Sequence, residues 1–222
     1  MRQAPVNIEE LADKVVGPVP RFDSTSQRVA VKLYRLLGEG NPVPVDYLAK
    51  TLNLLGETVS KVLSRHLVFY DDQRAVIGFG GLTVAEMPPH LFRVEDRTLY
   101  TWCAWDSLFI PGILRKAAHV TSRDPIARSP ISLTVAPDGV KDVNPRTTVV
   151  SFLTPERTFD RNVIVNFCHF IHFFSSQEAG EVWTASRPGT FLLSVEDAFA
   201  LGQLTNTRNF GDAITIPLAD EN

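Results

Sequence analysis

Apolar positions in the first third of the chain recur with the period of amphipathic helices. They are spaced three or four residues apart from residue 24 to Gly38, so one helix is predicted there. Two shorter helices are expected over residues 45–52 and 57–67, with Tyr47 among the side chains that face inward. An earlier short helix is expected over residues 8–15.

The pattern then changes to two short β-prone runs, residues 67–70 and 75–79, on either side of a polar turn. Three helices followed by a hairpin is the order of a winged helix-turn-helix module, which in other proteins places its third helix in the DNA major groove. Here the third helix offers only one lysine, one arginine and one histidine against a glutamate, which is little charge for holding phosphates. DNA binding is therefore disfavoured, and a structural role that covers a substrate is preferred for this module.

Two consecutive prolines, Pro88 and Pro89, mark a boundary, because proline interrupts helices and interior strands. Beyond them the chain predicts short strands separated by turns, which is typical of an antiparallel sheet, and two late helices. The strands are expected at residues 91–94, 129–135, 147–153 and 191–195, and the helices at 177–183 and 195–204. The predicted fold class is α+β, with an amino-terminal extension (1–24), a winged-helix-like three-helix module (25–86) and a mainly antiparallel sheet domain with flanking helices (87–222).

Residues 163–174 form a nearly continuous apolar and aromatic run that contains one of the two cysteines of the chain. This density of β-prone residues predicts a strand buried on both faces. Alternate side chains of a strand share a face, so Cys168 would face the same way as His172 and away from His169.

The second cysteine lies in the segment 99–110. If this segment is helical, Cys103 and Asp106 are three residues apart and share a face. A thiol becomes a nucleophile or a soft-metal ligand only when it loses its proton, and a neighbouring carboxylate can accept that proton. The large apolar neighbours, including Trp102 and Trp105, predict a dry setting that raises the pKa of Asp106. The plainer alternative is a buried helix with a core cysteine.

Composition bounds the function without identifying it. The chain has 222 residues, of which 44% are hydrophobic, and a formal net charge of -3, which suits one large or two small globular domains and argues against a polyanion as the main partner. No secretory signal and no apolar run as long as a membrane span is present in the sequence. Two cysteines do not make a disulfide framework, so both thiols are expected to be reduced, in the cytoplasm.

Reduced thiols can hold a metal ion. A closed zinc site needs four ligands, and the chain offers at most Cys103, Cys168 and His172, without CxxC or HxxxH spacing. Two thiolates suit instead a soft ion in linear coordination, such as mercury. The spacing permits residues 103 and 168 to meet but does not establish that they do.

Several stretches resemble the organomercurial (alkylmercury) lyases. The most specific are Trp102-Cys-Ala-Trp-Asp106 and Phe167-Cys-His-Phe-Ile-His-Phe-Phe174, and the segments 94–101, 130–137 and 194–202 accompany them. The similarity extends over roughly residues 25–205. It implies a catalytic set of two cysteines and one aspartate, which fall on Cys103, Cys168 and Asp106.

The resemblance implies cleavage of a carbon–mercury bond by protonolysis, giving a hydrocarbon and Hg(II), in mercury detoxification. Cys103 and Cys168 would hold the mercury of substrate and product, and Asp106 would deliver the proton, with no cofactor. The implied partners are the organomercurial substrate, small cytosolic thiols and mercuric reductase as acceptor of Hg(II). Three aromatic residues are expected to wall the organic group: Trp102, Trp105 and Phe167.

Two departures from relatives concern the surroundings of the cysteines. His169 follows Cys168 where some relatives have a further thiol, and Trp105 is bulkier than the aliphatic residue expected there, so it is predicted to narrow the pocket. Two non-catalytic alternatives stay open on the sequence. One is a metal-sensing or soft-metal-binding winged-helix protein, and the other is a relative that sequesters mercury without cleaving it.

Overall fold

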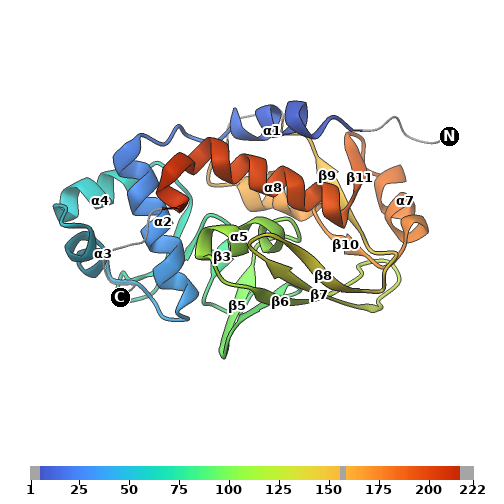
Figure 1. Ribbon diagram of the computed structural model, residues 1–222, viewed down its shortest axis with the longest axis horizontal. Coiled ribbons are helices and arrows are strands. Elements are labelled where there is room, and N and C mark those ends of the chain that lie inside the picture. The colour runs from blue at the N-terminus through green and yellow to red at the C-terminus, as the bar shows by residue number, and fades with distance from the viewer. Residues whose placement is uncertain (1–5, 156–158, 216–222) are drawn as a thin grey trace.

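The computed structural model describes residues 6–155 and 159–215. The molecule is elongated, with a group of helices at one end and two β-sheets along the rest of its length (Figure 1). Among the described residues, no helix combines the length and the apolar character that crossing a bilayer requires.

Four helices open the chain: α1 (Ile8–Val16), α2 (Ser24–Gly38), α3 (Val45–Leu52) and α4 (Gly56–Leu63). Polar side chains begin the first two, because Asn7 accepts a hydrogen bond from the Glu10 N–H and Asp23 accepts one from the Ser26 N–H. α2 is buried along most of its length and packs against α3 and α4. The predicted order of helices is confirmed.

Two details of these helices differ from the prediction. α4 ends at Leu63, four residues before the expected end. Tyr47 is 52% exposed, although it was expected to face inward. Leu48 and Leu52, one helical turn apart, define the buried face of α3, and Tyr47 lies a third of a turn away from that face.

One antiparallel sheet of eight strands follows, in the spatial order β1-β2-β3-β5-β4-β6-β7-β8. The strands are β1 (Val68–Tyr70), β2 (Val76–Phe79), β3 (Leu82–Thr83), β4 (Leu91–Val94), β5 (Arg97–Thr101), β6 (Ala118–Arg123), β7 (Pro130–Ala136) and β8 (Gly139–Asn144). The predicted β1–β2 hairpin joins the later strands through β3, which pairs with both β2 and β5. The sheet is therefore continuous across the two prolines at residues 88 and 89.

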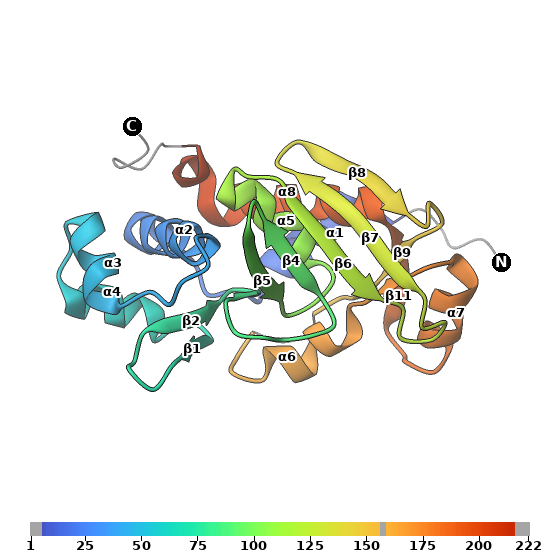
Figure 2. The ribbon, with the colours of Figure 1, turned by 90° about the horizontal axis from the view of Figure 1, so that it is seen from below.

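The carboxy-terminal part adds a second, three-stranded sheet in the order β10-β9-β11, with β9 (Val149–Leu153), β10 (Phe173–Phe174) and β11 (Thr190–Ser194). Helix α7 (Gln177–Ala185) packs on this sheet, and α8 (Val195–Phe210) crosses the molecule to reach α2. Figure 1 shows α1 lying along α8, and Figure 2 shows the strands β4, β6, β7 and β8 side by side with α5 (Asp106–Leu114) and α8 behind them.

The prediction of a helix through Cys103 is wrong. β5 ends at Thr101, Cys103 lies in the connecting turn, and α5 begins only at Asp106 and continues through Pro111. Hydrogen bonds to distant parts of the chain hold the turn open, since the Trp102 N–H donates to the Gly81 carbonyl and the Ala104 N–H donates to the Ile171 carbonyl.

The prediction of one buried strand over residues 163–174 is also wrong. The segment forms a short helix α6 (Val163–Asn166), a 3-10 turn (Cys168–Phe170) and only then β10. The Asp160 side chain accepts a hydrogen bond from the Asn162 N–H in the turn before the helix, and Val165 is 67% exposed. Only Phe173 and Phe174 find a partner strand, which is β9.

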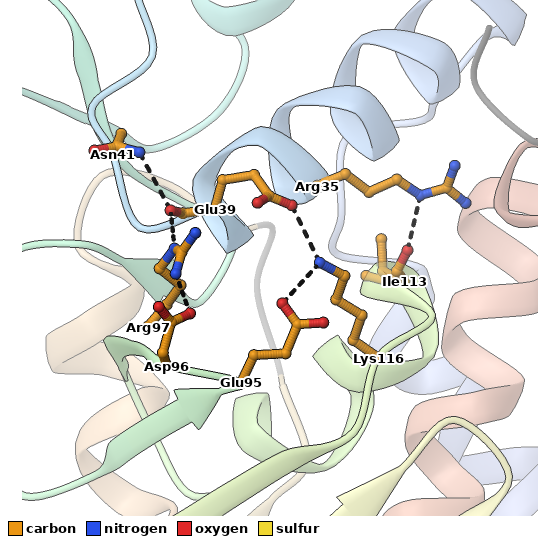
Figure 3. A network of polar contacts seen from close by, with 8 residues as sticks. All are labelled: Arg35, Glu39, Asn41, Glu95, Asp96, Arg97, Ile113 and Lys116. Carbon is orange, nitrogen blue, oxygen red and sulfur yellow. Dashed lines mark hydrogen bonds and ion pairs between the residues drawn. The ribbon is translucent and has the colours of Figure 1, made fainter. Parts of the chain in front are cut away.

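A polar network ties the end of α2 to the sheet (Figure 3). The Lys116 ammonium lies 3.3 Å from carboxylate oxygens of Glu39 and Glu95, and the Arg97 Nε donates to the Glu39 carbonyl at 3.1 Å. The Arg35 Nε donates to the Ile113 carbonyl at 3.2 Å, so the network also reaches the end of α5. These contacts fix the amino-terminal helices against the strands that lead to Cys103.

Candidate functional site

The two cysteines and the aspartate singled out in the sequence meet in space. The sulfur atoms of Cys103 and Cys168 and a carboxylate oxygen of Asp106 all lie within 4.8 Å of one another. Their exposed fractions are 0%, 5% and 6%, so the cluster is buried. Among the described residues, no other group of this kind is present.

Local hydrogen bonds set the position of Cys103 and Asp106. The Cys103 N–H donates to Asp106 Oδ2 at 2.8 Å, which closes the turn before α5. The Thr101 hydroxyl donates to the Cys103 carbonyl at 3.0 Å, and the Ser107 hydroxyl donates to the Ala104 carbonyl at 2.6 Å. A carboxylate at the first residue of a helix is also favoured by the helix dipole. Asp106 therefore has one defined orientation, toward the cysteine turn.

Main-chain contacts bring the second cysteine to the first. The Ile171 N–H donates to the Cys168 carbonyl at 3.0 Å, which forms the 3-10 turn that carries the thiol. The Ile171 carbonyl accepts from the Ala104 N–H at 3.2 Å, so this turn is joined directly to the residue after Cys103. The Ser151 N–H donates to the His172 carbonyl at 3.0 Å and anchors the segment on β9.

The two histidines of this segment do not join the cluster. His172 packs edge-on against Trp183, with ring centroids 4.8 Å apart, and its Nε2 lies 2.8 Å from the His169 carbonyl oxygen. The expectation that Cys168 and His172 converge on one face assumed a regular strand, and the 3-10 turn removes that geometry. No described histidine completes a zinc site with the two thiols.

Gly81, which the sequence analysis did not single out, leaves the space that the Asp106 carboxyl occupies. Gly81 has a φ of +98°, and a Cβ built on it would lie 2.5 Å from both Cγ and Oδ1 of Asp106. Its neighbour Gly80 also has a positive φ, and the Gly80 carbonyl accepts a hydrogen bond of 2.6 Å from the Tyr34 hydroxyl. Two consecutive glycines between β-prone runs indicate a tight turn, but the sequence does not show what that turn contacts.

Burial dominates the electrostatics of the cluster. It raises the pKa of Asp106 to about 7, although hydrogen bonds from the thiol and the backbone of Cys103 act in the opposite direction. Burial, the hydrogen bond with Cys168 and the negative charge of Asp106 raise the pKa of the Cys103 thiol well above its usual range. The hydrogen bond with Cys103 lowers the pKa of Cys168, but burial and the Asp106 charge outweigh it, so the net direction is upward. Both thiols thus hold their protons until a metal displaces them, and Asp106 is a carboxyl that can accept or donate a proton near neutral pH.

A cavity of ≈ 150 Å³ opens onto this cluster, and Asp106 and Cys168 both line it. Trp102 and Phe167, which the sequence analysis expects to wall the organic group, line it as well. Trp105 does not line it. Instead its indole N–H donates to the Ala198 carbonyl at 3.0 Å, and its ring meets Phe167 edge-on with centroids 6.4 Å apart.

Comparison with known proteins identifies similar chains that are alkylmercury lyases. The family model described as alkylmercury lyase matches residues 82–206. An alkylmercury lyase from Pseudomonas putida is 43% identical over 175 residues, which cover 78% of this chain and 81% of that protein. One from Streptomyces lividans is 39% identical over 181 residues, covering 81% and 83% respectively.

The fold agrees with that of a solved structure, the mercury-bound form of MerB2. The two superpose with a TM-score of 0.71 over 91% of this chain and 98% of the other, at 20% sequence identity. The resemblance inferred from the two cysteine motifs is thereby confirmed, and a catalytic role is favoured over that of a metal-sensing regulator. With about 40% identity to such enzymes over roughly four fifths of its length, the chain belongs to the alkylmercury lyase family.

Proposed function

We propose that Cys103, Cys168 and Asp106 together cleave the carbon–mercury bond of an organomercurial by protonolysis. In the overall reaction R–Hg⁺ and H⁺ give R–H and Hg²⁺. The observation that carries this proposal is the mutual distance of at most 4.8 Å between two thiol sulfurs and a carboxylate oxygen in a buried site. Two sulfurs can hold mercury while the oxygen remains within reach of the carbon bonded to it.

The carboxyl serves twice in this mechanism. The first thiol binds R–Hg⁺ as a thiolate and gives up its proton to a departing external thiolate. When the second sulfur binds, its proton passes to the Asp106 carboxylate. Asp106 then protonates the carbon, the electron pair of the Hg–C bond becomes that of the C–H bond, and Hg(II) stays on Cys103 and Cys168. A pKa of about 7 suits Asp106 to both transfers near neutral pH.

Water must be kept from the site while the proton is held. Trp102 and Phe167 line the cavity beside Asp106 and Cys168, and we propose that they exclude water around the organic group. Trp105 packs edge-on against Phe167, with 6.4 Å between the ring centroids. We propose that Trp105 does not narrow the pocket itself but affects its shape through this contact with Phe167.

We further propose how the enzyme is used. Both cysteines are free and buried, which suits a reducing cytoplasm where small thiols deliver the substrate and help to remove Hg(II), with mercuric reductase as the final acceptor. We propose that residues 25–86 form a winged-helix-like module after an extension of residues 1–24 and before the catalytic domain of residues 87–222. The module then covers the substrate, since residues from it line the cavity.

The test measures hydrocarbon release. Purified protein is incubated with phenylmercury and an excess of a small thiol, and benzene is quantified in the headspace. Cys103→Ser and Cys168→Ser should abolish benzene release, and Asp106→Asn should still bind mercury but release no benzene. Asp138→Asn, which changes an exposed aspartate in the β7–β8 turn, is the matched control and should behave as wild type. Benzene release at the original rate from Asp106→Asn would show that the proton has another source, and mercury binding without any benzene from wild type would indicate sequestration.

A further inference from the structure

Five aromatic side chains line one part of the cavity, and all of them lie outside residues 82–206, the part of the chain that the family model covers. We call this set the aromatic wall: Phe22, Tyr34, His66, Phe79 and Phe210. They come from the connection before α2, from α2 itself, from the segment after α4, from β2 and from the end of α8. Figure 1 shows the end of α8 beside α2.

The members of the aromatic wall contact one another in a closed ring. His66 stacks on Phe22 with centroids 4.8 Å apart and planes 11° apart, and its edge meets Phe79 at 5.8 Å. Tyr34 meets Phe79 at 5.2 Å and Phe210 at 6.1 Å, and Phe210 returns to Phe22 at 5.1 Å. Each ring is held by two others at distances at which aromatic pairs attract. The wall is therefore preorganised and presents fixed rings to the cavity.

The imidazole of His66 is an uncharged member of the wall. Burial, with a smaller effect from the neighbouring Arg65, lowers the pKa of His66 to about 4. At neutral pH the ring is thus a flat, neutral heterocycle stacked on Phe22. It adds no positive charge to the space that the organic group enters, which is also lined by two side chains of opposite charge, Arg65 and Asp160.

The size of the cavity matches a phenyl ring. A cavity of about 150 Å³ lined by apolar side chains is large enough to take up benzene, and this one measures ≈ 150 Å³. The rest of its apolar lining, which includes Trp102 and Phe167, faces the same space. A methyl group on mercury would leave most of this volume without contacts, whereas a phenyl group would fill it.

We propose that the aromatic wall selects aryl over methyl organomercurials, with Phe22 and His66 as specificity-determining residues. The inference rests on the proposed function, because it names the organic group that the same site prefers. Phe22 and His66 are only partly buried, unlike Tyr34, Phe79 and Phe210, so they can be replaced with little risk to folding.

The test compares ratios, which cancels the different intrinsic reactivities of the two substrates. kcat/KM is measured for phenylmercury and for methylmercury with excess thiol, as benzene and methane release, in wild type, Phe22→Ala, His66→Ala and His66→Phe. The phenyl-to-methyl ratio should fall about tenfold in each alanine variant, as expected for lost apolar contact in a pocket. His66→Phe should keep the ratio, because it preserves the plane and removes the nitrogens. Tyr70→Ala removes an exposed aromatic residue that does not line the cavity, and should leave the ratio unchanged.

A second measurement does not depend on turnover. Saturating benzene should raise the melting temperature of wild type and of His66→Phe, and should raise it less in the two alanine variants. A phenyl-to-methyl ratio within twofold of wild type in both alanine variants overturns the proposal, as does a loss in His66→Phe as large as in His66→Ala. If wild type releases neither gas, the lyase mechanism fails, and the benzene shift alone then decides whether the wall binds an aryl group.

Discussion

Replacing Gly81 by alanine should disable the enzyme without unfolding it. A Cβ at this position lies 2.5 Å from Cγ and Oδ1 of Asp106, whereas ordinary contact begins at 3.4 Å. The carboxyl must therefore retreat by about 0.9 Å, and a misplacement of about 1 Å at a reacting group costs on the order of 100-fold in rate. The retreat also strains the 2.8 Å hydrogen bond from the Cys103 N–H to Asp106.

The positive φ of Gly81, +98°, adds a cost to the stability of the fold. For a residue with a side chain this backbone conformation costs roughly 1–3 kcal/mol, which lowers the melting temperature but leaves most of a domain's stability in place. The assay is benzene release from phenylmercury at a temperature well below the melting transition measured by circular dichroism. We expect kcat to fall about 100-fold in the folded variant.

Two other glycines separate the effects of the backbone from those of the added methyl group. Gly211 has a φ of +49° and no atom within 4 Å of its built Cβ, so Gly211→Ala tests backbone strain alone. Gly139 has open space and no positive φ, so Gly139→Ala should be neutral. If folded Gly81→Ala keeps kcat within threefold of wild type, the position of the Asp106 carboxyl does not depend on the absence of a side chain at residue 81, and the reasoning is refuted.

Three further outcomes are expected. The pKa of Asp106 is raised from 3.8 to about 7, so between these pH values the folded protein keeps a proton that the unfolded chain loses. As the pH rises through this range, the free energy of unfolding of wild type should therefore fall by up to roughly 4 kcal/mol relative to that of Asp106→Asn, as measured in urea titrations. Trp105→Phe removes the indole N–H that donates to the Ala198 carbonyl and should cost about 0.5–1.5 kcal/mol in the same titrations. Lys116→Met breaks exposed ion pairs with Glu39 and Glu95 and should lower the free energy of unfolding by less than about 1 kcal/mol. The difference in stability between wild type and this variant should shrink as salt is added.

Elements governed by local rules were predictable from the sequence. α2 has the apolar period of a helix and glycine at its end, and the β1–β2 hairpin has a polar turn between β-prone runs. Each of these signals acts between residues close in the chain. The helices α3 and α7 were found in the same way.

The segments that carry the site were mispredicted, because distant contacts decide their conformation. Cys103 lies in a turn instead of a helix since its neighbours donate hydrogen bonds to Gly81 and Ile171. The run around Cys168 is rich in β-formers, yet partner strands are present for only two of its residues. Periodicity could not show that the two thiols meet, and only the resemblance of their motifs to a known family indicated it. Gly81 was overlooked for the same reason, since its role depends on where Asp106 lies.

The link between the two cysteine segments is made by peptide groups. The Ala104 N–H and the Ile171 carbonyl supply it, and any residue except proline can offer the same N–H at position 104. Most replacements of nearby side chains therefore leave this hydrogen bond, and with it the spacing of the two sulfurs, unchanged. Such an arrangement gives evolution freedom to remodel what surrounds the metal-binding atoms, and so to retune which organic groups are accepted, while the reactive geometry itself is inherited intact.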